Sequence, residues 1–213
     1  DYHSCPAMRV GAEQALAMAG KTVDDMQHFD LYSCFASAVE VACDALDIAH
    51  DDPRGLTVTG GLPFFGGPGN NYTMHAIAEM TGRLRSNAGD FGFVNGNGWF
   101  LTKHSFGVYS TQVPEGIFKR LDPKIYQAEI DAMSSPSLME EAHGAAHIET
   151  FSVAYQKSEP ALGIIIARLE DGGRCLSTTM DADMLQDLIG SQDAIGRAVQ
   201  IVHKDGRNHA SWA

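Results

Sequence analysis

A glycine-rich stretch at residues 60–76 has the composition of a loop that can present backbone N–H groups to a ligand. It reads GGLPFFGGPGNNYTMHA and leads directly into a helical pattern. A P-loop requires Lys and Ser/Thr where Gly67 and Pro68 stand, and Tyr72 occupies the third glycine of a G-x-G-x-x-G turn, so neither nucleotide motif is present. Two interpretations stay open. The stretch is a turn that is rich in glycine for steric reasons alone, or its free N–H groups hold an anion or a carbonyl oxygen at the helix start.

Three other groups of residues could do chemistry. Cys34, in YSCFAS, lies near an expected helix start, where a thiol gains reactivity; a buried and inert thiol is the alternative. Lys103 beside His104 would suit carbonyl polarisation or proton transfer. His143 and His147 could share a helix face, but no third ligand lies near them, so we expect no metal site.

Composition narrows the classes of function. The 213 residues include 15 Lys+Arg and 27 Asp+Glu, a formal charge of -12, which disfavours nucleic acid and anionic membranes as partners. The longest apolar run, GIIIA at 163–167, is far too short for a membrane span. Four irregularly spaced cysteines are typical of reduced thiols, and we expect a cytoplasmic protein. The first residue is not Met and a helical pattern follows almost at once, which suggests a piece of a longer protein.

Strand and helix patterns alternate in the first part of the chain, which predicts an α/β layer. Residues 6–19 predict a helix closed by Gly20, and FDLYSCF predicts a short strand or turn that opens a helix ending at Leu46. LTVT at 56–59 predicts a buried strand, and FGFV at 91–94 predicts another that NGNG interrupts. A helix is expected at 72–84, capped by Asn70 or Asn71; its apolar stripe would comprise Met74, Ile77, Ala78 and Leu84.

The pattern changes after Pro114. A connecting helix and linker occupy residues 119–139, and residues 140–213 read as a small β-rich domain with one short helix, DADMLQDLIG. Its strand-like runs are AHIETFSVAY, ALGIIIARLE, RCLSTTM, RAVQIVHK and NHASWA. An OB-like barrel is one candidate, and given the net charge we would expect it to bind a protein or acyl carrier.

Three segments together resemble the C-terminal half of thiolase-superfamily proteins: FDLYSCFASAVEVACDALDI, LTVTGGLPFFGGPGNNYTMHAIAEM and VNGNGWFLTKHSFGVYST. They are most similar to the thiolase-like, acetyl-CoA acetyltransferase group that has an additional C-terminal domain. The resemblance covers residues 1–118 as the thiolase-like half and, more loosely, 140–213 as the additional domain. It implies a layered α-β-α half with a mixed sheet, followed by the β-rich domain.

The resemblance also implies chemistry on acyl-CoA, a Claisen condensation or its reverse. In the family a nucleophilic Cys comes from the N-terminal half, which this chain does not include. The His of the Gly-His-Pro loop corresponds to Gly67, the acid/base Cys of the Cys-x-Gly turn to Val94, and the His of the H-D-C-F turn to Tyr32. Since glycine and valine can neither take nor give a proton, ordinary thiolase turnover is not expected of this chain.

Polar residues that would still line or adjoin such a site are therefore the candidates. Those for altered catalysis are Cys34, Asn95 and His104. Those for binding a coenzyme A thioester are Gly66, Gly67, Asn70, Asn97 and Lys103.

Two functions follow from these expectations. One is part of an acyl-CoA acyltransferase with changed groups; the alternative is a non-catalytic acyl-CoA-binding or assembly module. We expect no covalent cofactor and no metal. A lone half would expose the apolar face of the helix at residues 35–46, so the expected partner is the missing N-terminal half or a second copy of the chain.

Overall fold

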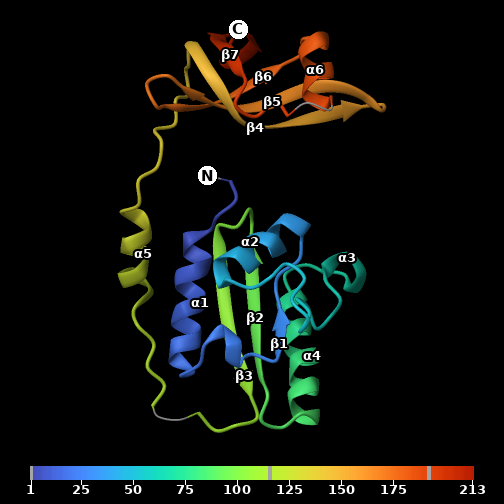
Figure 1. Cartoon of the computed structure of the whole chain (residues 1–213), viewed down its shortest axis with the longest axis vertical. Helices are drawn as coiled ribbons and strands as arrows, with labels where there is room; N and C mark the ends of the chain where they lie inside the picture. The colour runs from blue at the N-terminus through green and yellow to red at the C-terminus, as the bar shows by residue number, and fades with distance from the viewer. Residues whose placement is uncertain (1, 115–116, 191–192) are drawn as a thin grey trace. The chain divides into compact units, whose positions relative to one another are not determined.

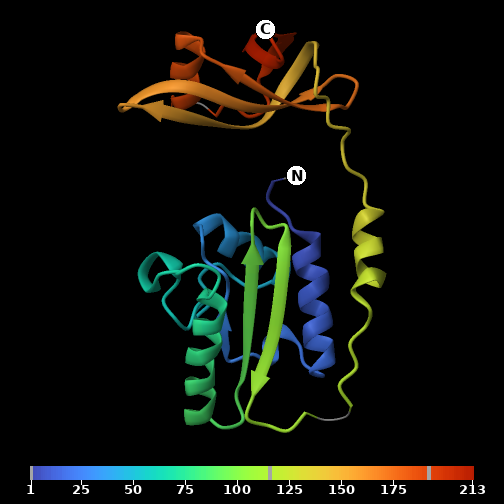
Figure 2. The same cartoon turned by 180° about the vertical axis from the view of Figure 1, so that it is seen from behind.

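The computed structural model describes residues 2–114, 117–190 and 193–213, which form two compact units, residues 1–133 and 134–213. We call them the first unit and the barrel unit. Figures 1 and 2 show the elements of each from opposite sides.

The first unit is built on a three-stranded mixed sheet in the order β1-β2-β3. Strand β1 (His28–Asp30) runs parallel to β2 (Phe91–Gly98), and β2 runs antiparallel to β3 (Lys103–Ser110). Buried residues of α1 (Pro6–Met18) and α2 (Ala36–Leu46) form one core with Phe29 and Phe93. Buried residues of α4 (Tyr72–Ser86) form another with Val94. Helices therefore cover both faces of the sheet, and a mixed α/β layer is confirmed (Figures 1 and 2).

Helix α1 ends as its sequence predicts. Gly20 has φ +64°, and its N–H donates to the carbonyl of Ala17 while the N–H of Lys21 donates to that of Leu16. This pair of bonds is the Schellman motif, which a glycine beyond the helix end favours. The short elements of the unit are the 3-10 turn η1 (Val23–Asp25), α3 (Leu62–Phe65) and α5 (Pro123–Asp131).

Strand β2 continues through the NGNG sequence, so the prediction of an interruption there was wrong. Its glycines allow close packing instead. A Cβ at Gly96 would lie 2.5 Å from Oγ of Ser105 and 3.1 Å from Oγ1 of Thr73, and a Cβ at Gly92 would overlap Met80 of α4. Glycine in a strand often marks such a close approach of a neighbouring element.

The predicted strand at residues 56–59 does not form. The N–H groups of Val58 and Thr59 donate instead to Oδ2 of Asp30, at 3.0 and 3.3 Å. The β-branched pattern was correct about burial at Val58, but a side-chain carboxylate takes the place of a neighbouring strand.

Two predicted apolar faces differ from the observed ones. In α4 the buried residues are Tyr72, Ala76, Met80 and Leu84, whereas Met74 is 71% exposed. The apolar residues of α2 are mostly buried within the first unit itself, so this helix does not carry the exposed face that we expected. Of the predicted stripe on α4 only Leu84 is fully buried, and the observed face begins at Tyr72, whose hydroxyl donates to Asp30.

The barrel unit is a closed five-stranded barrel in the order β4-β5-β6-β8-β7. Its strands are β4 (Gly144–Gln156), β5 (Glu159–Leu169), β6 (Arg174–Thr179), β7 (Ala198–Lys204) and β8 (Arg207–Trp212), and α6 (Ala182–Ile189) lies between β6 and β7 in sequence. All five strands and the helix were predicted. The five strands agree with the OB-like candidate, since an OB-fold is a five-stranded, partly open barrel. The largest fully buried side chains of its core are Ile148, Ile165, Met184 and Ile201.

Candidate functional site

A cavity of about 360 Å³ lies where the turn after β1 meets the end of the β2–β3 hairpin. We call it the Cys34 cavity; its lining includes Tyr32, Cys34, Phe35, Asn97, Trp99 and Phe100. The turn supplies the first three residues and the hairpin the other three, so parts of the chain more than 60 residues apart form one site. Two candidates from the sequence, Cys34 and Asn97, therefore lie together.

Asn97 is the amide that faces this thiol. Its Nδ2 lies 3.9 Å from Sγ of Cys34, at the limit of a weak hydrogen bond, and its Oδ1 is buried with no partner among the described residues. A buried amide oxygen without a donor is costly, so such groups often mark a functional site. Burial raises the pKa of the Tyr32 phenol beside it, and Cys34 adds to the effect. Tyr32 is therefore a neutral hydroxyl near neutral pH.

The outer wall of the cavity is aromatic and open to solvent. Trp99 and Phe100 are 80% and 84% exposed and stack at 6.3 Å with an angle of 7° between their rings. Trp99 and Leu101 have positive φ values of 54° and 57°, which fix the turn that presents the two rings. Large apolar side chains held in solvent on an ordered turn are typical of a surface that another molecule covers.

Asn95 is buried and does not line the cavity. Its Oδ1 accepts the N–H of Tyr32 at 3.4 Å, which ties β2 to the turn that carries Tyr32 and Cys34. We infer a positioning role for Asn95 rather than the catalytic role for which it was a candidate.

His104 and Lys103 do not act as a pair. Successive residues of a strand point to opposite faces, so their side chains diverge. Nε2 of His104 lies 3.1 Å from the carbonyl oxygen of Leu101 and 3.3 Å from Sγ of Cys5, while its Nδ1 is buried with no partner in the described chain. Burial lowers the pKa of His104, so its ring is neutral near neutral pH. Lys103 is exposed at the start of β3.

The glycine loop adjoins this turn but contributes none of the six named lining residues. Gly66 has φ +89° at the end of α3, and Gly67 and Asn70 are exposed. A Cβ at Gly67 would lie 2.9 Å from Cδ2 of Leu62, the end of a flexible side chain. Ser33 joins the two segments, because its Oγ accepts the N–H of Leu62 at 3.0 Å. The predicted binding residues of this loop are thus near the turn that carries Cys34, on a separate segment.

Val94 lies in the protein core. It is 2% exposed and packs in the cluster that includes Val58 and Tyr72. The position that the resemblance assigns to an acid/base Cys is therefore filled by an apolar side chain among other apolar ones.

Sequence reasoning missed Asp30, which organises this region. The residue is fully buried, and it accepts the N–H groups of Val58 and Thr59 and the hydroxyl of Tyr72, the last at 3.0 Å. Burial raises the pKa of its carboxyl group, and these hydrogen bonds partly offset the rise. The sequence signal was available, since an acidic residue at the end of an apolar strand needs partners when buried.

Residues 126–207 match the family model described as the thiolase-like protein type 1 additional C-terminal domain. The chain is similar across 99% of its length to a solved structure, that of a monomeric SCP2-thiolase-like protein type 1 from Mycobacterium smegmatis. The two are 42% identical in sequence, with a TM-score of 0.90. The chain is thiolase-like.

This thiolase-like chain spans less than half of that relative, 46% of its length. The region matched by the domain model begins within α5 and continues through most of the barrel unit. A comparison with curated proteins gives no match. No described helix is long and apolar enough to cross a membrane.

Proposed function

We propose that the chain is the C-terminal half of a thiolase-like protein and that it binds a coenzyme A thioester at the Cys34 cavity without the usual acid–base groups of a thiolase. The observation that carries the proposal is the amide of Asn97. Among the described residues its buried Oδ1 has no partner, and its Nδ2 has only the Cys34 thiol at 3.9 Å. An amide N–H of this kind is free to donate a stronger hydrogen bond to the carbonyl oxygen of a thioester.

The lining supports an acyl ligand over a nucleotide phosphate. Phe35, Trp99 and Phe100 offer apolar surface, and no cation is among the residues that line the cavity. Ligand sites commonly combine an apolar wall with a few polar groups that fix orientation. Here Asn97 and the hydroxyl of Tyr32 would orient the carbonyl group, and the acyl chain would lie on the aromatic wall.

Ordinary thiolase turnover is not part of the proposal. By resemblance the proton-transferring positions are Gly67, Val94 and Tyr32, and Val94 lies in the core. General acid–base help is worth about 10²–10⁴-fold in rate. Any chemistry in the whole protein would therefore depend on changed groups, with Cys34 as the nearest nucleophile.

Exposed apolar residues support the missing half of the protein as the partner. Phe64 is 90% exposed on α3, Met74 71% on α4 and Trp99 80% on the hairpin. The M. smegmatis relative is described as monomeric and is more than twice as long as this chain. We propose that the corresponding half of this protein covers these residues, and that it would complete the Cys34 cavity.

Calorimetry with the 213-residue chain and with the complete protein tests the binding proposal. Acetyl-CoA and a longer acyl-CoA should bind more tightly than free CoA, and Asn97→Ala should weaken thioester binding about 2–10-fold through loss of one hydrogen bond. Asn87→Ala, at the far end of α4, is the matched control and should have no effect. Equal affinity of Asn97→Ala and the unaltered complete protein would contradict the assignment of Asn97.

A thiolysis assay on the complete protein separates binding from turnover. We expect rates far below those of an ordinary thiolase, and little change in His104→Ala, because that ring faces Cys5 and not the cavity. Fast thiolysis would refute the claim that usual acid–base groups are lacking.

A further inference from the structure

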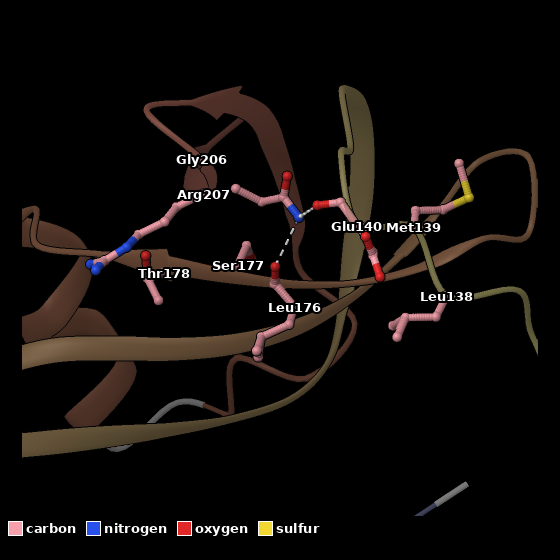
Figure 3. A pocket seen from close by; sticks show the side chains of 9 residues that line it. Leu138, Met139, Glu140, Leu176, Ser177, Thr178, Gly206 and Arg207 are labelled. Atoms are coloured by element: carbon pink, nitrogen blue, oxygen red, sulfur yellow. Dashed lines mark hydrogen bonds between the residues drawn. The ribbon is translucent and has the colours of Figure 1, made fainter.

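The barrel unit has a cavity of its own, with a volume of about 460 Å³. It opens over the seam where β6 meets β8, and we call it the seam pocket; its lining includes Leu138, Met139, Glu140, Leu176, Thr178 and Arg207 (Figure 3). Leu138 and Leu176 are 69% and 54% exposed, which is high for leucine on an ordered segment.

The contact between β6 and β8 has the fewest paired residues of any two neighbouring strands in the barrel. β6 and β8 pair in parallel at one residue pair, Thr178 with His209, whereas β5 and β6 pair at six positions. Asn208 fills the gap: its Nδ2 donates to the carbonyl oxygens of Glu140 and Leu176, at 3.0 Å each (Figure 3). A side-chain amide thus replaces a stretch of strand, and this leaves a hollow above Leu176 whose walls are fixed by hydrogen bonds.

Arg207 lines the seam pocket and brings a positive charge to it. Among the residues that the structure describes, its guanidinium has no hydrogen bond or ion pair. In Figure 3 the Arg207 side chain lies beside Thr178, the β6 residue that pairs with His209. Glu140 lies on the other side of Leu176 in Figure 3, so the charge at the Arg207 end is positive and not neutralised.

We propose that the seam pocket binds an aliphatic chain that ends in a carboxylate. The chain would lie over Leu176, Leu138 and Met139, and the carboxylate would pair with Arg207, with the Thr178 hydroxyl within the same end of the pocket. Arg and carboxylate form charge-assisted, often bidentate hydrogen bonds. This site is separate from the Cys34 cavity and does not rest on the function proposed for it.

The lining disfavours the oligonucleotides that OB-fold barrels often bind. Single-stranded nucleic acid is held by aromatic stacking and several cations, and the residues of this pocket include no aromatic side chain and one cation. A net charge of -12 adds general repulsion.

A chain-length series tests the aliphatic part of the proposal. Hexanoate, octanoate and decanoate, each below its micelle concentration, are titrated into the 213-residue chain, and binding is followed by calorimetry and by NMR shifts of backbone amides. Affinity should rise by up to about fourfold for each buried methylene until the pocket is full, and the shifts should map to β6, β8 and residues 138–140. Affinity that does not depend on chain length, or shifts confined to the first unit, would overturn the proposal.

Variants test the two ends separately. Arg207→Gln should weaken decanoate binding about tenfold and leave decanol binding unchanged, whereas Leu176→Ser should weaken both ligands. Lys157→Gln, in the β4–β5 turn, is the control and should bind like the unaltered chain. Decylamine that binds as tightly as decanoate, or unchanged decanoate affinity in Arg207→Gln, would refute the role of Arg207. Each variant lies in the barrel unit, so failure here leaves the Asn97 test unaffected.

Discussion

The buried carboxylate of Asp30 is predicted to hold the entrance of the glycine loop, and its removal gives a sharp test. Two of its hydrogen bonds replace the strand pairing that the sequence of residues 56–59 suggested, since the N–H groups of Val58 and Thr59 donate to Oδ2. Thr59 extends this ordering to the glycine loop, because its Oγ1 accepts the N–H of Gly61 at 3.1 Å. Asp30→Ala should therefore loosen residues 58–62 while β1 stays paired with β2.

The size of the effect follows from the donors that lose their acceptor. Asp30→Ala leaves two backbone N–H groups unpaired, at roughly 1–3 kcal/mol each, so the free energy of unfolding of the first unit should fall by roughly 2–6 kcal/mol. Tyr72 adds little, because its hydroxyl keeps a 2.6 Å hydrogen bond to Thr59. Asp30→Asn should cost less, about 1–2 kcal/mol, since an amide oxygen still accepts both N–H groups and its NH₂ can donate to Tyr72.

The pH dependence has a definite sign. Burial raises the pKa of Asp30 above its ordinary value of 3.8, so the folded state holds this proton to a higher pH than the unfolded state does. Stability from this group therefore falls as pH rises from about 3.8 through the raised pKa. Asp30→Asn removes that fall, because the amide does not titrate.

Hydrogen exchange by mass spectrometry on peptides covering residues 56–66 measures the local effect, with urea unfolding followed by circular dichroism for the global one. Asp51→Ala, at an exposed carboxylate, is the control and should leave exchange unchanged. If Asp30→Ala kept the protection of residues 58 and 59, the carboxylate would not be what holds this segment, and the reasoning would fail.

Further predictions concern both units. Gly67→His should fold normally, since only the flexible end of Leu62 must move, but should not restore thiolysis in the complete protein; a rate increase above 100-fold would contradict this. Glu149→Gln should remove a loss of barrel stability that sets in as pH falls below about 4.5, because hydrogen bonds from Arg174 and Arg168 lower the pKa of Glu149; acid titration by circular dichroism measures it. Asn208→Ala should speed hydrogen exchange in β8 by opening the seam, and unchanged exchange would show that the strands close it alone. The isolated 213-residue chain should self-associate in light scattering, and a clean monomer at high concentration would count against the exposed surface proposed to contact the missing half.

Local signals predicted the regular elements well. The Gly20 cap, the helix that begins at Tyr72 and all five barrel strands follow from short-range patterns that the structure confirms. Such signals depend on neighbours a few residues apart, and these neighbours are visible in the sequence.

Predictions that depend on distant partners were less accurate. The strand expected at residues 56–59 is absent because its partner is a carboxylate 28 residues away. Lys103 and His104 do not act together, since successive side chains of β3 point to opposite faces. The strand β3 itself had not been predicted. The closeness of Cys5 to His104, 99 residues apart, could not be inferred from spacing at all.

The candidate site was predicted in part for the same reason. Cys34 and Asn97 were both named from the sequence, but their contact depends on the parallel pairing of β1 with β2, which brings the turn after β1 to the far end of β2. Asn95 had the same signal as Asn97, and only its burial and its bond to Tyr32 distinguish the two roles.

The framework of this site does not depend on the proton-transferring side chains that the resemblance marks as replaced. The loop entrance is held by Asp30 and Ser33, and the Cys34 turn by Asn95. Ser33 stands where the H-D-C-F turn has Asp, and its hydroxyl joins the turn to the loop by accepting the N–H of Leu62. Gly67 is exposed, so the fold of the loop does not require a histidine side chain at this position. The residue at position 67 can therefore change while the loops keep their shape, and the proposed binding of a thioester without thiolase turnover requires this independence.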